Sequence, residues 1–448
     1  MLLSSNLRQL SSLFPSPLYV VGGAVRDALL GFKNYDYDLA SALTPPEVFA
    51  LLKNSGFRVV HTSFKLHTLR IMKDGECYEY TSFRKDSYAE NGAHTPLSVK
   101  LTNSIEEDAF RRDFSVNALY FDIQKEEYVD PTGGMQDIKE KKLRAVRCPY
   151  EVIAEDALRI LRLVRFSAEL GFSIEEQTFL AAKERIESLQ SISKERIREE
   201  FNKMLVADQR NGVEGAHLRA LRILDDLGAF SYIIPELLEG KGVEQRPDFH
   251  KYDVFEHNIR TCGYAEPSVR LAALLHDIAK PKMLRETGRM AGHEKAGAQM
   301  TSEILRRLRY SNKEIYHAKR LVSTHMYDYN FTTSEKKLRL FVLENHAAID
   351  DIIALKNADT LATGMSEARS PSGLRLKAVW EKMKEEGIPL QISQLDVKGE
   401  DLIEINIPPR LRGQALEKLL KTAANDKSLH TREAQLKFLK NYSFNKEK

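Results

Sequence analysis

The sequence has 448 residues, a hydrophobic fraction of 42% and a formal net charge of +3. This is long for one core, so we expect about two to four units, and any nucleic-acid binding must depend on local patches rather than global charge. Three scattered cysteines, Cys77, Cys148 and Cys262, exclude a disulfide framework and favour a reducing compartment. No stretch approaches a membrane span, so the sequence predicts a cytoplasmic protein with no membrane partner.

The first informative segment combines an apolar run with two glycines. Residues 18–21 suit a buried strand, and residues 24–30 are compatible with a helix. Gly22 and Gly23 between them allow backbone N–H groups to approach phosphate oxygens, and Arg26 is available for the same anion. The segment predicts a strand, a turn and a helix that together bind phosphate.

Two aspartates follow at short spacing. If residues 35–39 form a strand, alternation places Asp36 and Asp38 on one face and Tyr37 on the other. Paired carboxylates are the oxygen ligands that two Mg²⁺ ions bridging a triphosphate require. Phosphate cradle and carboxylate pair together predict a nucleotidyl transfer site.

These residues carry a resemblance to a known family. GGAVRDALLG at residues 22–31 and DYDL at 36–39 resemble the first motif of class II tRNA nucleotidyltransferases and bacterial poly(A) polymerases. The resemblance implies an α+β fold, in which a head similar to DNA polymerase β, with a mixed sheet and helices, precedes an all-helical neck, an HD-type body and a tail. It also implies Mg²⁺ at Asp36 and Asp38, with Glu79, in an alternating run, as the third catalytic carboxylate.

Three further head segments resemble family elements. Residues 84–99 show little periodicity and predict a mobile loop, where the family has a flexible element tied to the switch from C to A addition. RRDFSVNA at 111–118 resembles the second motif, which implies that Arg112, Asp113 and Asn117 contact the nucleotide sugar and triphosphate. DPTGGMQDI at 130–138 predicts a turn between head and neck.

Residues 155–166 have helical apolar spacing and predict one helix. Glu155 and Asp156 lie four and three residues before Arg159, a pattern that chemistry alone reads as an ordinary salt bridge. The resemblance implies base selection instead, with Asp156 and Arg159 pairing with incoming CTP or ATP while Glu155 holds Arg159. Arg162 and Arg165 fall outside this trio and are left facing either RNA or solvent.

Helical periodicity dominates from about residue 146 onward. Helical segments are predicted near residues 186–189, 197–205 and 218–227. The expected domains are a head at 1–145, a neck and RNA-binding region at 146–240, an HD-type domain at 241–365 and a tRNA-binding tail at 366–448.

A second chemistry is predicted downstream. His276 and Asp277 are adjacent in an apolar segment that predicts a helix, and with His257 and Asp359 they match the ligand order of the HD phosphohydrolase superfamily. His293 and His325 are further candidates. Mixed His and Asp ligands suit a divalent metal that activates water, and the resemblance implies action on 2′,3′-cyclic phosphate or 2′-phosphate ends.

The sequence therefore predicts template-independent addition of CCA to tRNA 3′ ends from CTP and ATP. An enzyme that adds only CC or only A remains open, because loop details decide between them. A poly(A) polymerase is a weaker alternative, since residues 62–68 and the tail fit the tRNA-specific branch better. The intact carboxylates disfavour a non-catalytic RNA-binding protein.

Overall fold

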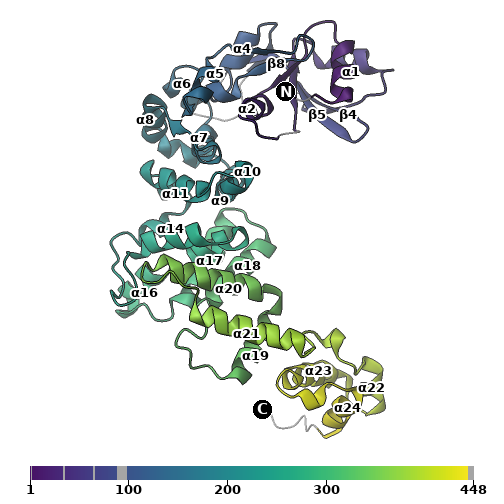
Figure 1. Ribbon diagram of the computed structural model, residues 1–448, viewed down its shortest axis with the longest axis vertical. Coiled ribbons are helices and arrows are strands. Elements are labelled where there is room, and N and C mark those ends of the chain that lie inside the picture. The colour runs from purple at the N-terminus through teal and green to yellow at the C-terminus, as the bar shows by residue number, and fades with distance from the viewer. Residues whose placement is uncertain (2, 34–35, 64–65, 88–97, 442–448) are drawn as a thin grey trace. The chain divides into compact units, whose positions relative to one another are not determined.

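The computed structural model describes residues 1, 3–33, 36–63, 66–87 and 98–441. The chain divides into two compact units, Met1–Pro235 and Glu236–Lys448, and every strand among the described residues belongs to the first unit (Figure 1). The expected fold class is confirmed: a mixed sheet with helices is followed by helical structure. Across the described ranges, no helix has both the length and the apolar character that crossing a membrane would need.

The head contains a seven-stranded sheet in the order β3-β4-β5-β2-β1-β8-β9. Only β2 and β5 pair in parallel, and the other neighbours are antiparallel. The strands are β1 (Tyr19–Val21), β2 (Asp38–Ser41), β3 (Arg58–Ser63), β4 (Thr68–Lys73), β5 (Glu76–Ser82), β8 (Tyr120–Asp122) and β9 (Glu127–Val129).

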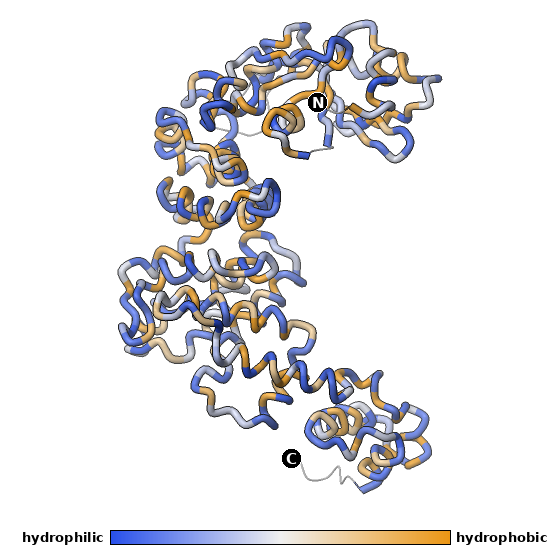
Figure 2. The backbone as a smooth tube through the Cα atoms, in the orientation of Figure 1, coloured by the Kyte–Doolittle hydropathy of each residue, from blue (hydrophilic) through white to orange (hydrophobic). Residues whose placement is uncertain are grey.

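The middle of this sheet is held by apolar side chains. Val21, Ala40 and Tyr120, one from each central strand, pack with Phe83 and Val152 in a buried cluster. Hydrophobic residues recur along the strands and on one face of many helices (Figure 2). Burying them fixes the strand register, and the register decides which polar side chains meet at the strand ends.

Helices complete the first unit. They are α1 (Ser5–Leu13), α2 (Gly23–Leu29), α3 (Pro45–Leu52), α4 (Ile105–Phe110), η1 (Ser115–Asn117), α5 (Gly134–Lys139), α6 (Pro149–Glu155), α7 (Leu158–Leu170), α8 (Glu176–Glu184), η2 (Ile186–Ser191), α9 (Lys194–Leu205), α10 (Ala207–Asn211), α11 (Ala216–Asp226) and α12 (Phe230–Ile233). A two-stranded parallel ribbon, β10 (Lys142–Leu143) with β11 (Ser173–Ile174), joins α5 to the helices that follow.

The second unit is helical throughout the part that the structure describes. After α13 (Pro235–Leu238) come α14 (Val254–Tyr264), η3 (Pro267–Val269), α15 (Arg270–Leu275), α16 (Lys280–Thr287), α17 (His293–Arg307), α18 (Asn312–Thr324), α19 (Glu335–Asn345), η4 (His346–Ala348), α20 (Ile349–Ala362), α21 (Pro371–Glu385), η5 (Ile392–Gln394), α22 (Gly399–Glu404), α23 (Pro409–Ala423), η6 (Lys427–Leu429) and α24 (Arg432–Asn441). Helix α14 packs against α15 and α20, and α17 packs against α18.

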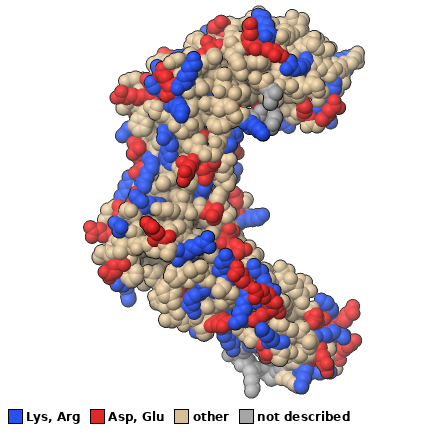
Figure 3. Space-filling model, viewed as in Figure 1, with Lys and Arg blue, Asp and Glu red and all other residues tan. Residues whose placement is uncertain are grey.

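Charged side chains of both signs are interspersed over the face shown in Figure 3, in keeping with the small net charge. A weakly basic chain of this kind has to bind anions through local clusters, which directs attention to its cavities.

Four local expectations differ from the structure. Residues 84–99 were expected to be a loop, but β6 (Arg84–Ser87) and β7 (Ser98–Leu101) pair as antiparallel strands, while residues 88–97 lie outside the described part. The expected strand at 35–39 begins only at Asp38, and Tyr35 is outside the described residues. The segment 62–68, which favoured the tRNA-specific branch, lies partly outside the described part, because residues 64–65 are not described.

The third and fourth differences concern expected helices. Residues 155–166 are interrupted because Asp156 has an extended backbone, with φ −147°, and its carboxylate accepts from the Leu158 N–H at 3.0 Å. His276 and Asp277 follow the end of α15 rather than lying within a helix. Pro281 at the start of α16 explains this second break, because proline is favoured in the first turn of a helix.

Candidate active site and metal centre

The first unit contains a polar cavity of about 740 Å³. Most of the expected transferase residues line it, and Glu155 is the exception among them. The lining is Gly22, Gly23, Arg26, Asp36, Asp38, Glu79, Arg84, Asp86, Arg111, Arg112, Asp113, Asn117, Asp156, Arg159, Arg162, Arg165, Phe166, Glu169, Lys203 and Arg210.

Three carboxylates reach this cavity, Asp38 and Glu79 from neighbouring strands and Asp36 from the segment just before β2. Asp38 opens β2 and is the direct partner of Glu79 in the parallel register with β5. Asp36 and Asp38 are exposed, whereas Tyr37 between them is buried and lines a different cavity. The pKa of Asp38 is raised to about 6, chiefly because surrounding protein displaces water, with Asp36 and Glu79 adding repulsion that Arg112 only partly offsets. This donor set is short of positive charge, which is the condition that a divalent cation would relieve.

The glycine turn sits between β1 and α2. Gly22 has φ +73°, and its N–H donates to the Leu119 carbonyl at 2.9 Å. A side chain there would be strained and would contact the Arg112 guanidinium and the Asn117 carbonyl, each 3.5 Å from the Cβ position. The turn therefore keeps the backbone close to Arg112, one of the arginines that line the cavity.

Arg112 is fixed by a buried carboxylate that sequence reasoning missed. Asp108, fully buried on α4, accepts from Arg112 at 3.0 Å and from the Tyr120 hydroxyl at 2.7 Å. Burial opposes its ionisation, but Arg112 and Arg111 outweigh burial and lower the pKa of Asp108 to about 2. Its position four residues before Arg112 was the available signal.

Asp113 joins the second motif to helix α7. Its carboxylate accepts from Asn117 at 3.1 Å and from Arg162 at 2.7 Å. Asn117 in turn accepts from Arg26 at 2.5 Å, and Arg26, which is only 2% exposed, is also paired with Asp27. Arg26 therefore reaches the cavity as a buried, protein-bonded cation rather than as a free phosphate ligand.

The base-selecting trio is divided by the break at Asp156. Arg159 pairs with Glu155 at 2.8 Å and also donates to the Val152 and Arg111 carbonyls. Asp156 pairs with Arg196 at 3.2 Å. The structure thus brings Asp156 and Arg159 to the same cavity through different ion pairs. Glu155 does not line the cavity and is the ion-pair partner of Arg159.

One aromatic ring, that of Phe166, lies next to three of the arginines that line the cavity. The guanidinium carbons of Arg26, Arg162 and Arg165 lie 5.2, 5.0 and 4.0 Å from the centre of the Phe166 ring, within cation–π range. Arg165, which sequence analysis left facing RNA or solvent, is buried and paired with Glu169 and Glu200. The helical spacing of these residues along α7 was the signal for this cluster.

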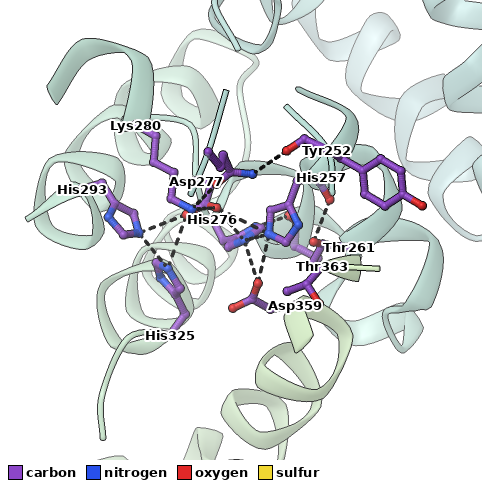
Figure 4. A network of polar contacts seen from close by, with 12 residues as sticks. Tyr252, His257, Thr261, His276, Asp277, Lys280, His293, His325, Asp359 and Thr363 are labelled. Carbon is purple, nitrogen blue, oxygen red and sulfur yellow. Dashed lines mark hydrogen bonds and ion pairs between the residues drawn. The ribbon is translucent and has the colours of Figure 1, made fainter. Parts of the chain in front are cut away.

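The second unit gathers the expected HD residues around Asp277 (Figure 4). His257 Nε2 lies 3.0 Å from Asp359 Oδ1 and 3.2 Å from His276 Nε2. His276 Nε2 lies 3.3 Å from Asp277 Oδ2. Burial opposes the charged form of His276, but Asp277 and Asp359 outweigh it and raise the pKa to about 10.

The two further candidate histidines approach the other oxygen of Asp277. His293 Nε2 is 3.0 Å and His325 Nε2 is 3.6 Å from Asp277 Oδ1. The Nδ1 atoms of His276, His293 and His325 lie 2.7 to 2.8 Å from backbone carbonyls. A carbonyl accepts an N–H, so Nδ1 of each ring donates, and Nε2 is the atom that faces the cluster and could bind a metal once it is unprotonated.

Within this cluster, two groups of three residues each have ligand atoms close enough together to bind one metal ion. They are His257 with His276 and Asp359, and His276 with Asp277 and His325. Lys280, which the sequence did not single out, lies 2.5 Å from Asp277 Oδ2. Its place three residues after Asp277 was the available signal.

Carboxylates on the neighbouring strands β2 and β5 share one cavity with several arginines, and this arrangement defines a nucleotidyltransferase head. An RNA-binding region and an HD domain follow along the chain. Residues 18–144 match the family described as Poly A polymerase head domain, 171–240 the probable RNA and SrmB-binding site of polymerase A, and 262–364 the HD domain. An A-adding tRNA nucleotidyltransferase of Deinococcus radiodurans is 32% identical over 81% of this chain and 79% of its own length. The chain belongs to the tRNA nucleotidyltransferase and poly(A) polymerase family.

Other relatives are CCA-adding enzymes. A CCA-adding enzyme of Streptococcus mutans is 41% identical over 42% of this chain and 46% of that enzyme. The chain thus aligns with about half the length of this relative. The Bacillus stearothermophilus CCA-adding enzyme in complex with CTP is similar in fold, with a TM-score of 0.69 and 24% identity over 96% of this chain and 95% of that one.

Proposed function

We propose that this chain adds CCA to the 3′ ends of tRNA, using CTP and ATP as substrates in the cytoplasm. The observation that carries the proposal is the meeting of Asp36, Asp38 and Glu79 with Arg112 and Arg162 in one cavity. Negative charge at one position and cations beside it suit a triphosphate whose α-phosphate is attacked. Relatives described as CCA-adding enzymes support the same reaction.

Asp36, Asp38 and Glu79 would hold Mg²⁺, because their oxygens are the hard ligands this ion prefers. When bound, two such ions lower the pKa of the primer 3′-hydroxyl and neutralise charge on the α-phosphate. In the reaction, the 3′-oxygen forms a bond to the α-phosphorus while the bond to the leaving pyrophosphate breaks.

The remaining cavity residues would bind and orient the nucleotide. The Gly23 backbone N–H, at the start of α2, would face the triphosphate, the turn at Gly22 would let the backbone approach it, and Arg26 would supply buried positive charge. Arg112, Asp113 and Asn117 contact the sugar and triphosphate side, where their mutual hydrogen bonds keep them fixed.

Asp156 and Arg159 would select the base, since a carboxylate accepts and a guanidinium donates hydrogen bonds to base edges. Glu155 positions Arg159 through its 2.8 Å ion pair. The domain limits expected from the sequence, with the neck and RNA-binding region at 146–240 and the tail at 366–448, are kept in this proposal.

The direct test uses three tRNA transcripts that end at the discriminator base, at C and at CC. Each is incubated with CTP, ATP or both, and the product ends are sequenced. Addition of CCA to the discriminator-ended transcript, followed by a stop, supports the complete enzyme.

One specific observation favours an A-adding enzyme as the second candidate: the A-adding relative aligns over 81% of this chain. Addition of A to the CC-ended transcript alone would establish this activity and overturn complete CCA addition. Addition of CC alone would identify a CC-adding enzyme, and long A tracts would identify a poly(A) polymerase.

We further propose a phosphohydrolase activity for the HD domain, expected at residues 241–365. His257, His276, Asp277 and Asp359 would hold a divalent metal, because the first three are buried, Asp359 is partly buried, and their Nε2 and carboxylate atoms fit such an ion. The metal supplies activated water when bound. Release of phosphate from 2′-phosphate ends, or opening of 2′,3′-cyclic ends, in the presence of Mg²⁺, Mn²⁺ or Ni²⁺ is the expected result; no hydrolysis with any of them would contradict it.

A further inference from the structure

Arg147 lies just before helix α6 and is not among the described residues that line the transferase cavity, yet its guanidinium reaches Glu155. Its Nη1 donates to Glu151 Oε2 at 2.6 Å, and its Nη2 donates to Glu155 Oε1. These partners lie four and eight residues further along the chain, so one side chain follows about two turns of the helix. A guanidinium presents its N–H donors as a rigid planar fork, which allows it to bind two carboxylates at once. Arg147 therefore braces α6 up to Glu155, the residue at which that helix ends.

Glu155 is shared between two arginines. Its Oε1 accepts from Arg147, and its Oε2 accepts from Arg159 Nη1 at 2.8 Å. The side chain of Glu155 is 20% exposed and that of Arg159 is 7% exposed, so water competes little for these contacts. Because each carboxylate oxygen is bonded to a different guanidinium, the carboxylate cannot turn without breaking one of the two ion pairs. Arg147 thus affects the orientation of Arg159 through Glu155.

The same two arginines also contact consecutive backbone carbonyls. Arg147 Nε donates to the Phe110 carbonyl at 3.2 Å, and Arg159 Nη2 donates to the Arg111 carbonyl at 2.8 Å. Phe110 ends helix α4, and carbonyls at a helix end lack partners within the helix, so cations are favoured there. The contacts close into a ring that runs from Phe110 through Arg147, Glu155 and Arg159 to Arg111, the residue bonded to Phe110. This ring fixes Arg159 relative to the second motif.

We propose that Arg147 is a positioning residue for base selection and acts on Arg159 through Glu155. This inference rests on the proposed selection of the base by Asp156 and Arg159. Cytosine and adenine present an amino group where uracil and guanine present a carbonyl oxygen, so discrimination depends on where donors and acceptors of the protein point. A guanidinium that is free to turn can satisfy a wrong base, and loss of the brace should therefore reduce selectivity.

The kinetic test measures selectivity on the full chain as a ratio of two kcat/KM values. CTP is compared with UTP on a tRNA transcript that ends at the discriminator base, and ATP is compared with GTP on a transcript that ends at CC. Arg147→Met keeps a long side chain but removes the donors, and it should lower both ratios by about tenfold, since a misplaced binding group discriminates poorly. Loss of folded protein reduces both kcat/KM values equally, so a merely destabilised variant would keep the wild-type ratios.

Glu151→Gln is the matched control, because Glu151 is the other carboxylate partner of Arg147 and its side chain is 66% exposed. It should leave both ratios unchanged, as an exposed ion pair contributes little. In a Glu155→Met background, Arg147→Met should lower the ratios no further, since the brace acts through that carboxylate. Wild-type ratios in Arg147→Met, or a further tenfold fall in the Glu155→Met background, would overturn the proposal.

Arg159→Met separates this inference from the function on which it rests. Lost selectivity in Arg159→Met together with wild-type ratios in Arg147→Met would overturn only the positioning role of Arg147. Wild-type ratios in both variants would contradict base selection by Arg159 as well. If the chain adds A alone, the ratio for ATP and GTP on the CC-ended transcript still tests Arg147, although complete CCA addition is then overturned.

Discussion

Asp38 and Glu79 are direct partners across the parallel pair β2 and β5, the only parallel pair of the seven-stranded sheet. Residues paired in register present their side chains on the same face of a sheet. Strand β5, which comes after the first motif in the chain, thereby places Glu79 as a third carboxylate beside Asp36 and Asp38.

Asp38→Asn should lower nucleotide transfer by more than about 100-fold, because it removes a charge aimed at the reacting phosphate. Binding of tRNA, measured by filter retention, should change little. Glu127→Gln on the exposed edge strand β9 is the control. Transfer at the normal rate in Asp38→Asn would show that the carboxylates have been assigned the wrong role.

Gly134→Ala should destabilise the head, because the new Cβ would lie 2.2 Å from the Ser115 carbonyl oxygen. Ser115 begins η1, which carries Asn117, so activity should fall together with stability. We expect a loss of about 1 to 3 kcal/mol in urea unfolding. Gly413→Ala, with nothing within 4 Å, should be neutral or slightly stabilising. Equal stability of the two variants would contradict the packing argument.

Asp108→Asn should cost stability in a pH-dependent way. The folded pKa of Asp108, about 2, is below the ordinary aspartate value of 3.8, so its charge stabilises the fold above pH 3.8. A shift of this size is worth about 2 kcal/mol and is lost as the pH falls toward 2. The difference between wild type and variant in urea unfolding should therefore shrink between pH 5 and pH 3. A stability difference between wild type and variant that stays constant over this pH range would mean that the charge of Asp108 does not stabilise the fold.

Phe166→Leu should raise KM for CTP and ATP more than it lowers kcat. Three guanidinium groups lose their shared ring face, and each such contact is worth about 0.5 to 1 kcal/mol. Phe110→Leu, on an exposed side chain of α4 that does not line the cavity, serves as the comparison. An unchanged KM in Phe166→Leu would show that the cluster acts only in folding.

His276→Ala should abolish phosphohydrolase activity and divalent metal retention while nucleotide transfer continues. His276 belongs to both groups of candidate ligands, so no group keeps its full set without it. Retained metal can be counted by elemental analysis after gel filtration. His317→Ala, a histidine outside both groups, is the matched control. Loss of transfer in His276→Ala with the fold intact would instead indicate that the two units depend on each other.

The sequence by itself determined the local chemistry of this protein. Glycines, paired aspartates and the order of histidines and aspartates identify their motifs because the chemistry requires those residue types at short spacing. Helical periodicity likewise predicted the helical remainder, since burial follows the period of each element, whereas the mixed head was implied by the resemblance of its motifs.

Only the tertiary structure decided which distant groups meet. The ion pair of Asp113 with Arg162 and the approach of His293 and His325 to Asp277 depend on strand register and helix packing. The break at Asp156 also escaped prediction, because the aspartate carboxylate captures a backbone N–H that a continuous helix would use differently. Such contacts are non-local or compete with the helix, so residue spacing alone carries no signal for them.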